Sequence, residues 1–450
     1  MTGIENRKQW IERREYVERL AAAEGNGMVK IITGLRRCGK SHLLGVAFRR
    51  YLKEKGVDEG HIHAVSLDLK PWEALQDPDR LYRHFAEKIK ADGKRHYVFI
   101  DEVQLCRKTL KAGADPSRVA PEEREGLYTT FHDTLNSLAA LPGADVYVTG
   151  SNSKMLSKDI ATQFRGRGWE LRMRPLSFAE FLPVHGGEKA EAWEDYLSHG
   201  GLPQVVLERD ETEKRRLLAG LFARTYLRDI AERHGIRDTE ALGRVSDMLC
   251  SAVGSLTNPG RLANAFASAW RGKGPTEPTV RAWLGHFEDA FLFARADRWD
   301  VKGGRYLSSP SKWYATDLGL RNARTNYRQM EAPHLLENAL YNELAGRGYA
   351  VDVGVVESVE SAGGGRQKHV RREIDFVVNT PKRRVYIQSA FAIPDADKRR
   401  QETAALRRAG GAFRKIIVTG GSEKPWVDEE GVVTVGVIPF MLDRSFVESW

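Results

Sequence analysis

One eight-residue segment near the amino terminus constrains the fold of this chain more than any other feature. Residues 34–41 read G-L-R-R-C-G-K-S and match the pattern G-x-x-x-x-G-K-[ST] in full. The β-branched run 28–33 before it predicts a buried strand, and a helical pattern begins near Ser41. A glycine-containing loop between a strand and a helix can wrap its backbone N–H groups around an anionic phosphate.

The positions that the pattern fixes in this loop can each be given a chemical role. Gly34 and Gly39 let the backbone turn inward, Lys40 reaches the β- and γ-phosphates, and the hydroxyl of Ser41 is placed to bind Mg²⁺. For Cys38, a spacer position and a redox role are both open. The alternative for the whole motif is a chance match in a glycine-rich chain. We expect the nucleotide to be bound by Gly34, Leu35, Arg36, Arg37, Cys38, Gly39, Lys40, Ser41 and His42.

A second segment carries the carboxylates that such a site needs. Residues 97–100 are apolar and predict a buried strand, and Asp101 and Glu102 follow at its carboxyl end, where α/β sheets place their ligands. We expect Asp101 to hold Mg²⁺ through water and Glu102 to polarise the attacking water as the general base. The alternative is an ordinary strand end with two solvated acids.

Polar and basic residues follow a third predicted strand at 146–149. Asn152 is our first candidate for a residue that senses the γ-phosphate and orients the water, and Ser151 is the second. Arg165 and Arg167 follow the next helix, and an arginine there can reach the nucleotide of a neighbouring subunit and stabilise the transition state. A pair of surface arginines is the alternative.

Short apolar strands alternate with helical segments up to about residue 185. This alternation predicts an α/β fold with a parallel sheet that is covered on both faces. The polar segment 105–127 contains two prolines and is expected to be a loop or an insertion. Beyond the strands named above, we expect strands at residues 61–69 and 169–174.

The composition excludes several classes of protein. The chain has 450 residues and only three cysteines, which lie far apart and exclude a disulfide scaffold and a zinc ribbon. No apolar run nears the ~18 residues of a membrane span, and the charged amino-terminal segment lacks the core of a signal peptide. We therefore expect a cytoplasmic protein with no membrane partner. The net charge of +9 permits nucleic-acid binding without requiring it.

Residues 239–330 predict a small helix-rich module that ends in a hairpin. Asn258 and Thr276 are placed to begin helices, and an apolar stripe between 280 and 291 predicts the module's core. Two short helices followed by a basic hairpin resemble a winged helix, which would contact DNA phosphates; the alternative is a packing domain with a solvated basic rim. The basic residues of the hairpin are Arg295, Arg298, Lys302, Arg305 and Lys312.

Together these motifs resemble one family, the prokaryotic AAA-like ATPases with an uncharacterised carboxyl-terminal domain of nuclease fold. The resemblance starts from the phosphate loop and residues 97–102 and covers nearly the whole chain. Its further segments are residues 149–156, 164–167, 175–181, 200–203, 229–233, 314–321 and 336–341.

The resemblance implies an additional-strand P-loop ATPase of AAA+ type, with ATP and Mg²⁺ as cofactors, that forms a homo-oligomeric ring. We divide the chain accordingly into an ATPase domain at 1–185, a helical lid at 186–238, the winged-helix-like module at 239–330 and a PD-(D/E)XK-like α/β domain at 331–450. An ATPase, a lid and a winged helix in series also resemble the architecture of the Holliday-junction branch-migration motor.

The last domain resembles the PD-(D/E)XK nuclease fold, in which acids bind Mg²⁺ and a lysine helps to activate water. Asp375 stands for the first acid and Glu337 for the acid on the helix, whereas Gln388 replaces the second acid and Ala390 replaces the lysine. Loss of this charge and this base weakens metal binding and water activation. We therefore expect a DNA-binding domain with a degenerate nuclease site at Glu337, Asp375 and Gln388.

The charge distribution favours DNA binding by this domain. Between residues 366 and 415 there are 14 basic and 5 acidic residues, an excess as large as the net charge of the whole chain. Such clusters are typical of phosphate contacts, and a solvated face of helix and loop is the alternative.

Three functions are consistent with these features. The first is a DNA-stimulated oligomeric ATPase that acts on branched or otherwise structured DNA. The second is a nucleotide-switched regulator that binds a protein partner or a promoter. The third is an ATP-gated nuclease of a mobile-element or defence system, which Gln388 and Ala390 disfavour.

Overall fold

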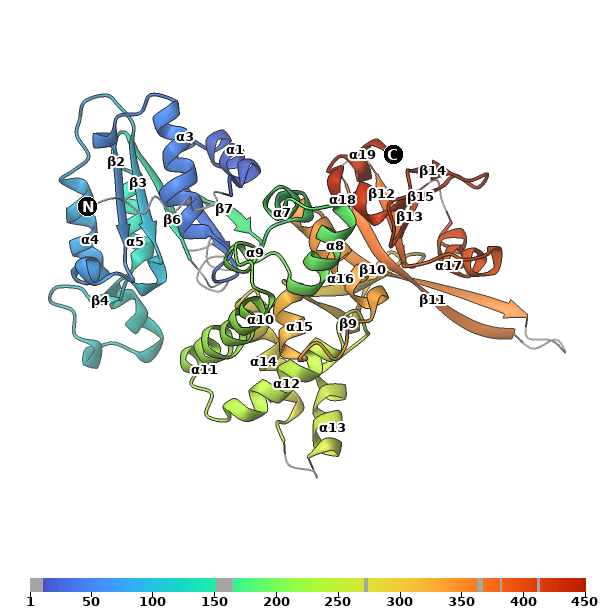
Figure 1. Cartoon of the computed structure of the whole chain (residues 1–450). Coiled ribbons are helices and arrows are strands. Elements are labelled where there is room, and N and C mark those ends of the chain that lie inside the picture. The colour runs from blue at the N-terminus through green and yellow to red at the C-terminus, as the bar shows by residue number, and fades with distance from the viewer. Residues whose placement is uncertain are drawn as a thin grey trace. The chain divides into compact units, whose positions relative to one another are not determined.

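The computed structural model describes residues 11–150, 164, 166–270, 274–361, 367–380, 383–410 and 413–450. The chain divides into two compact units (Figure 1). The first unit comprises the residues up to Arg174 together with 289–291, and the second comprises 175–288 and 292–450. Each unit has its own central sheet.

The first unit contains a parallel five-stranded sheet with the strand order β2-β3-β6-β1-β7. Strand β6 lies between β1, which leads into the phosphate loop, and β3, which ends at Asp101. This inserted strand agrees with the additional-strand topology expected from the sequence. The strands are β1 (Val29–Gly34), β2 (Ile62–Ser66), β3 (His96–Asp101), β6 (Ala144–Thr149) and β7 (Gly168–Met173).

Both faces of this sheet are covered by helices, as the apolar strands predicted. On one face, Val98 and Ile100 belong to a core completed by α4 (Pro78–Ala86) and α5 (Phe131–Ala139). On the other face, Phe48 packs against Phe99 and Tyr147, with ring centroids 6.0 and 5.0 Å apart. Phe48 comes from the helix after the phosphate loop, which runs through α2 (Lys40–His42), a π-helical segment (Leu43–Phe48) and α3 (Arg49–Glu54).

The remaining segments of the first unit are short. A helix near the amino terminus, α1, spans Arg14–Ala22. Residues 105–127 contain short 3₁₀ turns rather than regular helices or long strands, so the expectation of a loop or insertion is confirmed. A two-stranded ribbon encloses most of this segment and consists of β4 (Thr109–Leu110) and β5 (Tyr128–Thr129).

A buried ion pair ties two strands of this sheet together. The Lys30 side chain on β1 is inaccessible to solvent, and its ammonium donates to the carboxylate of Asp145 on β6. Asp145 also accepts hydrogen bonds from the Tyr147 hydroxyl at 3.0 Å and from the backbone N–H of Gly25 at 2.9 Å. Burial lowers the pKa of Lys30, and its hydrogen bond to Asp145 opposes that shift.

The second unit begins with a helical part, as the sequence predicted. Asn258 caps a helix by accepting from the N–H of Arg261 at 2.7 Å, and the apolar stripe at 280–291 is buried. The helices are α7 (Phe178–His185), α8 (Lys189–His199), α9 (Pro203–Val206), α10 (Glu211–Gly220), a π-helical segment (Leu221–Leu227), α11 (Arg228–His234), α12 (Thr239–Ser251), α13 (Pro259–Ala269), α14 (Glu277–Asp289) and α15 (Leu318–Arg324).

Two segments of the family resemblance, residues 200–203 and 314–321, contact each other in this unit. Asp317 caps α15 and also accepts from the N–H of Gly201 at 2.8 Å, and burial raises its pKa to about 6. A Cβ on Gly319 would lie only 2.0 Å from the carbonyl oxygen of His199. Asn322 donates to two carbonyls near the end of α8, at 2.8 and 3.0 Å. The residues of these motifs therefore fasten α15 to the end of α8.

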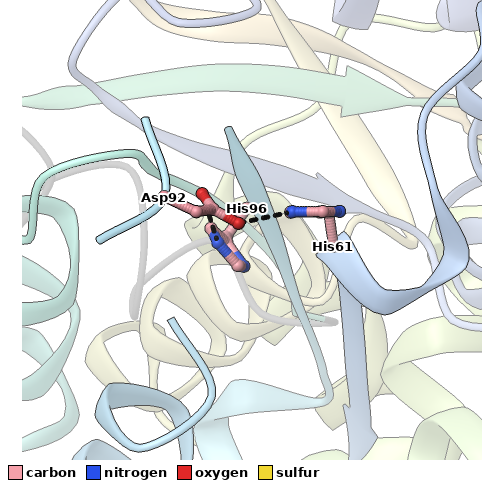
Figure 2. Close-up of side chains that lie close together, drawn as sticks. All are labelled: His61, Asp92 and His96. Carbon is pink, nitrogen blue, oxygen red and sulfur yellow. Dashed lines mark hydrogen bonds and ion pairs between the residues drawn. The ribbon is translucent and has the colours of Figure 1, made fainter. Parts of the chain in front are cut away.

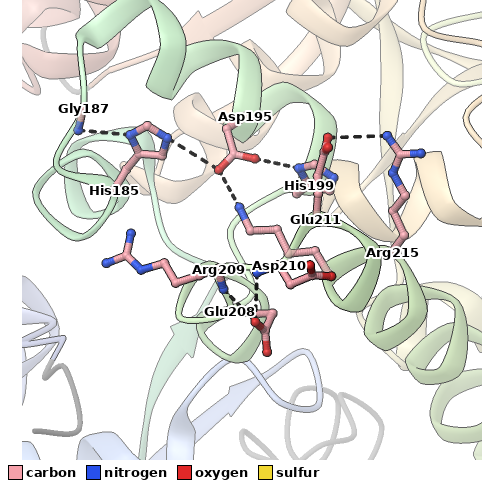
Figure 3. A network of polar contacts seen from close by, with 10 residues as sticks. His185, Gly187, Asp195, His199, Glu208, Arg209, Asp210, Glu211 and Arg215 are labelled. Carbon is pink, nitrogen blue, oxygen red and sulfur yellow. Dashed lines mark hydrogen bonds and ion pairs between the residues drawn. The ribbon is translucent and has the colours of Figure 1, made fainter.

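A network around Asp195 secures the same helix (Figure 3). The carboxylate accepts from Lys214 of α10 at 2.8 Å, lies 2.6 Å from Nδ1 of His199 and lies 3.7 Å from Nε2 of His185. Burial alone would raise the pKa of Asp195, but the hydrogen bonds from His199 and Lys214 hold it at about 2. Asp195 therefore stays ionised and links α8 to α10 at neutral pH.

The carboxyl-terminal part contains a mixed eight-stranded sheet with the order β14-β15-β13-β12-β11-β10-β8-β9. The helices packed on it or beside it are α16 (Ala332–Gly346), α17 (Ala396–Arg408), α18 (Val437–Leu442) and α19 (Phe446–Ser449). The strands are β8 (Phe293–Asp300), β9 (Arg305–Ala315), β10 (Ala350–Ser361), β11 (Gln367–Asn379), β12 (Arg384–Ala390), β13 (Arg414–Thr419), β14 (Trp426–Val427) and β15 (Val432–Gly436).

The basic hairpin expected to be a wing is the β8–β9 edge of this sheet. Strand β8 runs parallel to β10, with Arg298 opposite Val353, so the hairpin is not a free wing. The physical reason is its apolar content, because Phe293, Trp313 and Tyr314 are buried. Among the described residues, no helix combines the length and the apolar character needed to cross a lipid bilayer.

We predict that Asp145→Ala lowers the free energy of unfolding by about 3–5 kcal/mol, because it leaves the Lys30 ammonium buried without its counter-charge. Urea denaturation of the full chain measures this loss. Glu18→Ala is the control, since it breaks an exposed pair with Arg14 on α1 and should change the stability by less than about 0.5 kcal/mol. Equal effects of the two substitutions would contradict the role given to the buried pair.

Candidate functional site

The phosphate loop has the backbone conformation that its glycines make possible. Gly34 and Gly39 have φ values of 138° and 103°, which side-chain-bearing residues rarely adopt. A Cβ on Gly34 would also lie 2.0 Å from the carbonyl oxygen of Met173 on the neighbouring strand. Gly39 directly precedes the helix that starts at Lys40, so the loop leads into a helix N-terminus, as anion binding requires.

The side chain of Lys40 folds back onto this loop. Its ammonium donates to the carbonyl oxygens of Gly34 and Leu35 at 3.0 and 3.1 Å, and the residue is 5% exposed. The next two side chains, Ser41 and His42, are exposed at the start of the helix. The lysine is therefore held at the loop, where it can meet a phosphate, and the hydroxyl of Ser41 is open to solvent.

Cys38 occupies an interior position of the loop. It is completely buried, its thiol faces the carbonyl oxygen of Met173 at 3.7 Å, and its own carbonyl accepts from Arg13 at 3.3 Å. A thiol closed off from solvent is poorly placed for redox chemistry, so this geometry favours the spacer role.

Asp101 and Thr149 come together at the carboxyl ends of the neighbouring strands β3 and β6. The hydroxyl of Thr149 donates to one carboxylate oxygen of Asp101, and the hydroxyl of Ser66 donates to the other at 3.0 Å. The sequence reasoning missed Thr149 and Ser66. The sequence feature that could have identified them as site residues is that each is a polar residue at the carboxyl end of a strand.

Glu102 has a strained backbone. Its φ is 53°, in the left-handed region that non-glycine residues seldom adopt, and its N–H donates to the hydroxyl of Thr149 at 3.0 Å. Gln104 also donates to its carboxylate. Thr149 thus contacts both acids and fixes the turn that separates them, and strain of this kind is common where catalytic groups are positioned.

The other candidates around the nucleotide are only partly described. Ser151, Asn152 and Arg165 lie outside the described residues. Arg167 is exposed, and its carbonyl oxygen accepts from the N–H of Val29 at 2.8 Å, at the start of β1. Because β1 and β7 are parallel, Arg167 lies at the amino edge of the sheet, about 16 Å of strand away from the phosphate loop.

A histidine cluster also lies at this amino edge (Figure 2). His61 Nε2 is 2.9 Å from a carboxylate oxygen of Asp92, and His96 Nε2 is 3.5 Å from the other. Each of these three residues offers one atom that could bind a metal ion, and the three atoms lie within 4.8 Å of one another.

Both ring nitrogens of His96 already have partners in this cluster. Nε2 accepts from the N–H of Lys90 at 3.3 Å, and Nδ1 is 3.0 Å from Nε2 of His63. Burial lowers the pKa of the adjacent His63 to about 4, so that imidazole is uncharged at neutral pH. The geometry is that of a hydrogen-bonded link between the edge strand β2 and its neighbour β3.

In the second unit, three carboxylates gather around one buried lysine. The ammonium of Lys312 on β9 lies 2.8 Å from Glu337, 2.6 Å from Glu373 and 3.6 Å from Asp375. Its side chain is only 4% exposed, and Tyr314 donates its hydroxyl to Glu337 at 2.7 Å. Burial and the neighbouring Glu337 raise the pKa of Asp375, while these carboxylates together raise that of Lys312 despite its burial.

The positions carried over from the nuclease fold meet this cluster only in part. Glu337 and Asp375 both belong to it, through Lys312. The amide of Gln388 instead approaches Glu402 of α17 at 3.5 Å, and Ala390 is buried. Lys312 was expected on the basic rim of the hairpin, and no role at this site was expected for Glu373. The ammonium balances charge that a metal ion would otherwise balance.

The basic window at 366–415 is less uniformly positive than its sequence indicates. Several of its cations form ion pairs with acidic residues. Some of these acids lie outside residues 366–415, and others lie three or four residues away on the same helix. Ion pairs join Arg371 to Glu357, Arg399 to Asp428, Arg407 to Glu430, Arg400 to Asp397 and Lys398 to Glu402. Part of the apparent excess therefore belongs to salt-bridged surface.

We predict that Thr149→Val preserves ATP binding and lowers ATP turnover by about a hundredfold, because Asp101 and Glu102 lose the hydroxyl that positions them. Binding of a labelled nucleotide and steady-state hydrolysis measure the two effects separately. Thr149→Ser keeps the hydroxyl and should stay close to the wild type. Normal ATP turnover by Thr149→Val would show that the Thr149 hydroxyl does not position the two acids.

We predict that Lys312→Met lowers the free energy of unfolding by about 3–5 kcal/mol at pH 8, because three carboxylates lose their cation. Without it, the pKa of Asp375 rises further above its unfolded value. Protonation then favours the folded state, so the variant should regain stability as the pH falls from 8 to 5.5. Urea denaturation at both pH values tests this, with the exposed Lys302→Met as the control. A loss independent of pH would contradict the electrostatic explanation.

Two protein families match consecutive parts of the chain. Residues 26–182 match the family described as "AAA domain", and residues 190–331 match one described as "Domain of unknown function (DUF8612)". The first match includes the phosphate loop, Asp101, Glu102 and the five strands of the parallel sheet. It agrees with the AAA-like ATPase expected from the sequence.

Two solved structures of archaeal proteins align with most of this chain. The Walker-type ATPase PABY2304 of Pyrococcus abyssi is 15% identical, with a TM-score of 0.46 over 71% of this chain and 97% of that one. The ORC2 protein of Aeropyrum pernix, solved with ADPNP and ADP, is 14% identical, with a TM-score of 0.36 over 75% of this chain and 97% of that one.

Two relatives align with nearly the whole chain. An uncharacterized protein of Methanocaldococcus jannaschii is 26% identical over 431 residues, which cover 92% of this chain and 87% of that protein. An uncharacterized protein of Haemophilus influenzae is 30% identical over 441 residues, which cover 97% of this chain and 99% of that protein. The chain therefore belongs to the same family as the Haemophilus influenzae protein, and its residues 26–182 form an AAA-like P-loop domain.

Proposed function

We propose that the chain is a homo-oligomeric ATPase that hydrolyses ATP with Mg²⁺ and couples hydrolysis to DNA binding. The observation that carries the ATPase part is the carboxyl edge of the first sheet. There the loop with Lys40 follows β1, Asp101 and Glu102 follow β3, and Thr149 at the end of β6 hydrogen-bonds to both acids. Parallel strands bring these groups to one edge, where α/β proteins bind their ligands.

The residues at this edge fit the needs of a nucleoside triphosphate. Lys40 would bind the β- and γ-phosphates, and the N–H groups of the loop would surround them. The hydroxyl of Ser41 and the carboxylate of Asp101 would hold Mg²⁺, which neutralises phosphate charge. Glu102 would accept the proton of the attacking water. Asn152 is proposed to sense the γ-phosphate because it follows β6 three residues after Thr149.

The position of Arg167 supports an oligomer. It lies at the opposite edge of the sheet from the phosphate loop of its own chain, too far away to reach the nucleotide bound there. An exposed arginine at that edge could meet a nucleotide only in a neighbouring copy. We infer that Arg167, together with Arg165, acts as an arginine finger between subunits of a ring.

The proposal of DNA binding rests on the positive charge of the second unit. Lys302 and Arg305 are exposed at the tip of the β8–β9 hairpin, and Tyr306 beside them is 60% exposed. Exposed cations with an aromatic ring are suited to a nucleic-acid backbone and its bases. We propose branched or structured DNA as the substrate class, by analogy with the branch-migration motor, and consider the nuclease-like centre degenerate because Lys312 occupies it.

We predict distinct effects for three substitutions in the ATPase machinery. Lys40→Ala should abolish nucleotide binding, and Glu102→Gln should bind ATP but turn it over at least about a hundredfold more slowly. Arg167→Ala should lower turnover by about a thousandfold while leaving nucleotide affinity unchanged. ATP hydrolysis is measured alone and with single-stranded, duplex and four-way-junction DNA.

The outcomes of that experiment separate the functions. Stimulation by one structured DNA supports the coupled ATPase. Slow turnover that no DNA changes, together with an inert Arg167→Ala, would instead favour a nucleotide-switched regulator. Normal hydrolysis by Glu102→Gln would show that the assignment of the general base is wrong.

A further inference from the structure

A cavity of about 490 Å³ in the second unit has a strongly basic lining. Four arginines line it, and the only carboxylate among the lining residues is that of Glu373. The arginines come from α13 (Arg261), β8 (Arg298) and β11 (Arg371 and Arg372). A cavity that gathers guanidinium groups from three separate elements is suited to an anion.

Arg298 is the unusual member of this group. The residue is 8% exposed, its side-chain Nε is buried without a partner, and the structure gives its guanidinium no hydrogen bond or ion pair with any described residue. A guanidinium is always charged at physiological pH, and burying it without a partner is strongly unfavourable. A buried unpartnered cation on the wall of a cavity indicates that its counter-charge comes from a ligand.

The other walls do not supply that counter-charge. The carboxylate of Glu373 lies 2.6 Å from the ammonium of Lys312 and forms its ion pair there, not with Arg298. Arg371 is paired with Glu357, and Arg261 donates to the carbonyl oxygen of Leu256 at 2.9 Å. Asn258, the cap of α13, also lines the cavity, so the amino end of an 11-residue helix adds further positive potential.

We propose that this arginine pocket, defined by Arg261, Arg298, Arg371 and Arg372, binds a phosphate of the DNA backbone. The proposal deepens the DNA-binding function proposed above and rests on it. The cavity has the size of a site for a whole small ligand, which is more space than one free oxyanion needs, so it has room for a phosphate with its sugar. Lys302 and Arg305 lie farther along the same hairpin and would contact the flanking backbone.

The arrangement also assigns different roles to the two buried cations of the hairpin. Lys312 is matched by protein carboxylates, whereas Arg298 is left for a ligand. Arg298 should therefore contribute to DNA affinity while destabilising the DNA-free chain. A residue with a purely structural role would have the opposite effect on stability.

The test measures DNA binding and thermal unfolding of the full chain and its variants. We expect Arg298→Leu to weaken binding of a fluorescent 25-base-pair duplex at least tenfold, to reduce the salt dependence of binding by about one phosphate contact, and to raise or preserve the melting temperature without DNA. Arg261→Leu, on α13, should weaken binding in the same way. Arg216→Leu on α10 removes an exposed arginine away from the pocket and should change neither property.

Several results would overturn the inference. Wild-type affinity in both Arg298→Leu and Arg261→Leu would exclude the pocket from the DNA site. A lower melting temperature of Arg298→Leu without any change in affinity would assign the residue a structural role. Stabilisation of the wild type by inorganic phosphate as strong as that by the duplex, lost in Arg298→Leu, would show a site for free phosphate instead of DNA.

ATP turnover in the same preparation separates this inference from the proposed ATPase. Turnover without any DNA binding would overturn the pocket and the DNA-coupled part of the function, and would leave the ATPase standing. Wild-type DNA affinity in both Arg298→Leu and Arg261→Leu, with DNA-stimulated turnover intact, would overturn the pocket alone.

Discussion

A charged side chain inside a protein must be matched by an opposite charge or by hydrogen bonds, and this requirement organises both units of the chain. In the first unit, Lys30 and Asp145 pair between β1 and β6, the strands that lead to the phosphate loop and to Thr149. In the second, Asp317 is satisfied by backbone N–H groups that fasten α15 to the end of α8. Each of these interactions joins segments that are far apart in sequence. The buried charges therefore also determine which segments pack against each other.

The catalytic edge of the first unit follows from local patterns that the sequence displays directly. A β-branched strand, a loop with two glycines and a helix start are consecutive at residues 28–41, and the acids at 101 and 102 end an apolar strand. Parallel pairing then brings these strand ends to one edge without further information. Thr149 and Ser66 could not be assigned in this way, because their roles arise from contacts between strands more than 30 residues apart.

The second unit shows where reasoning from composition fails. A hairpin rich in basic residues predicted a solvated wing, but Arg298 and Lys312 are buried. For Lys312 a signal was available, since its neighbours Trp313, Tyr314 and Ala315 form an apolar run that predicts burial on both faces of the strand. Glu337 and Asp375, the carboxylates that make this burial tolerable, come from α16 and β11, and no local pattern links those elements to the hairpin.

The two buried cations of the hairpin show how structural and functional charges can be told apart. Lys312 is surrounded by Glu337, Glu373 and Asp375, so the fold gains from its charge and has no need of a ligand. Arg298 lines a cavity that shares Glu373 with this cluster, yet Glu373 forms its ion pair with Lys312 and the structure gives Arg298 no ion pair with a described residue. Because a fold selected only for stability would place an apolar side chain at such a position, the unbalanced charge is best explained by something that the pocket binds. Lys312 thus holds the Glu373 carboxylate of the pocket wall in an ion pair, and Arg298 remains the pocket cation that an anionic ligand would balance.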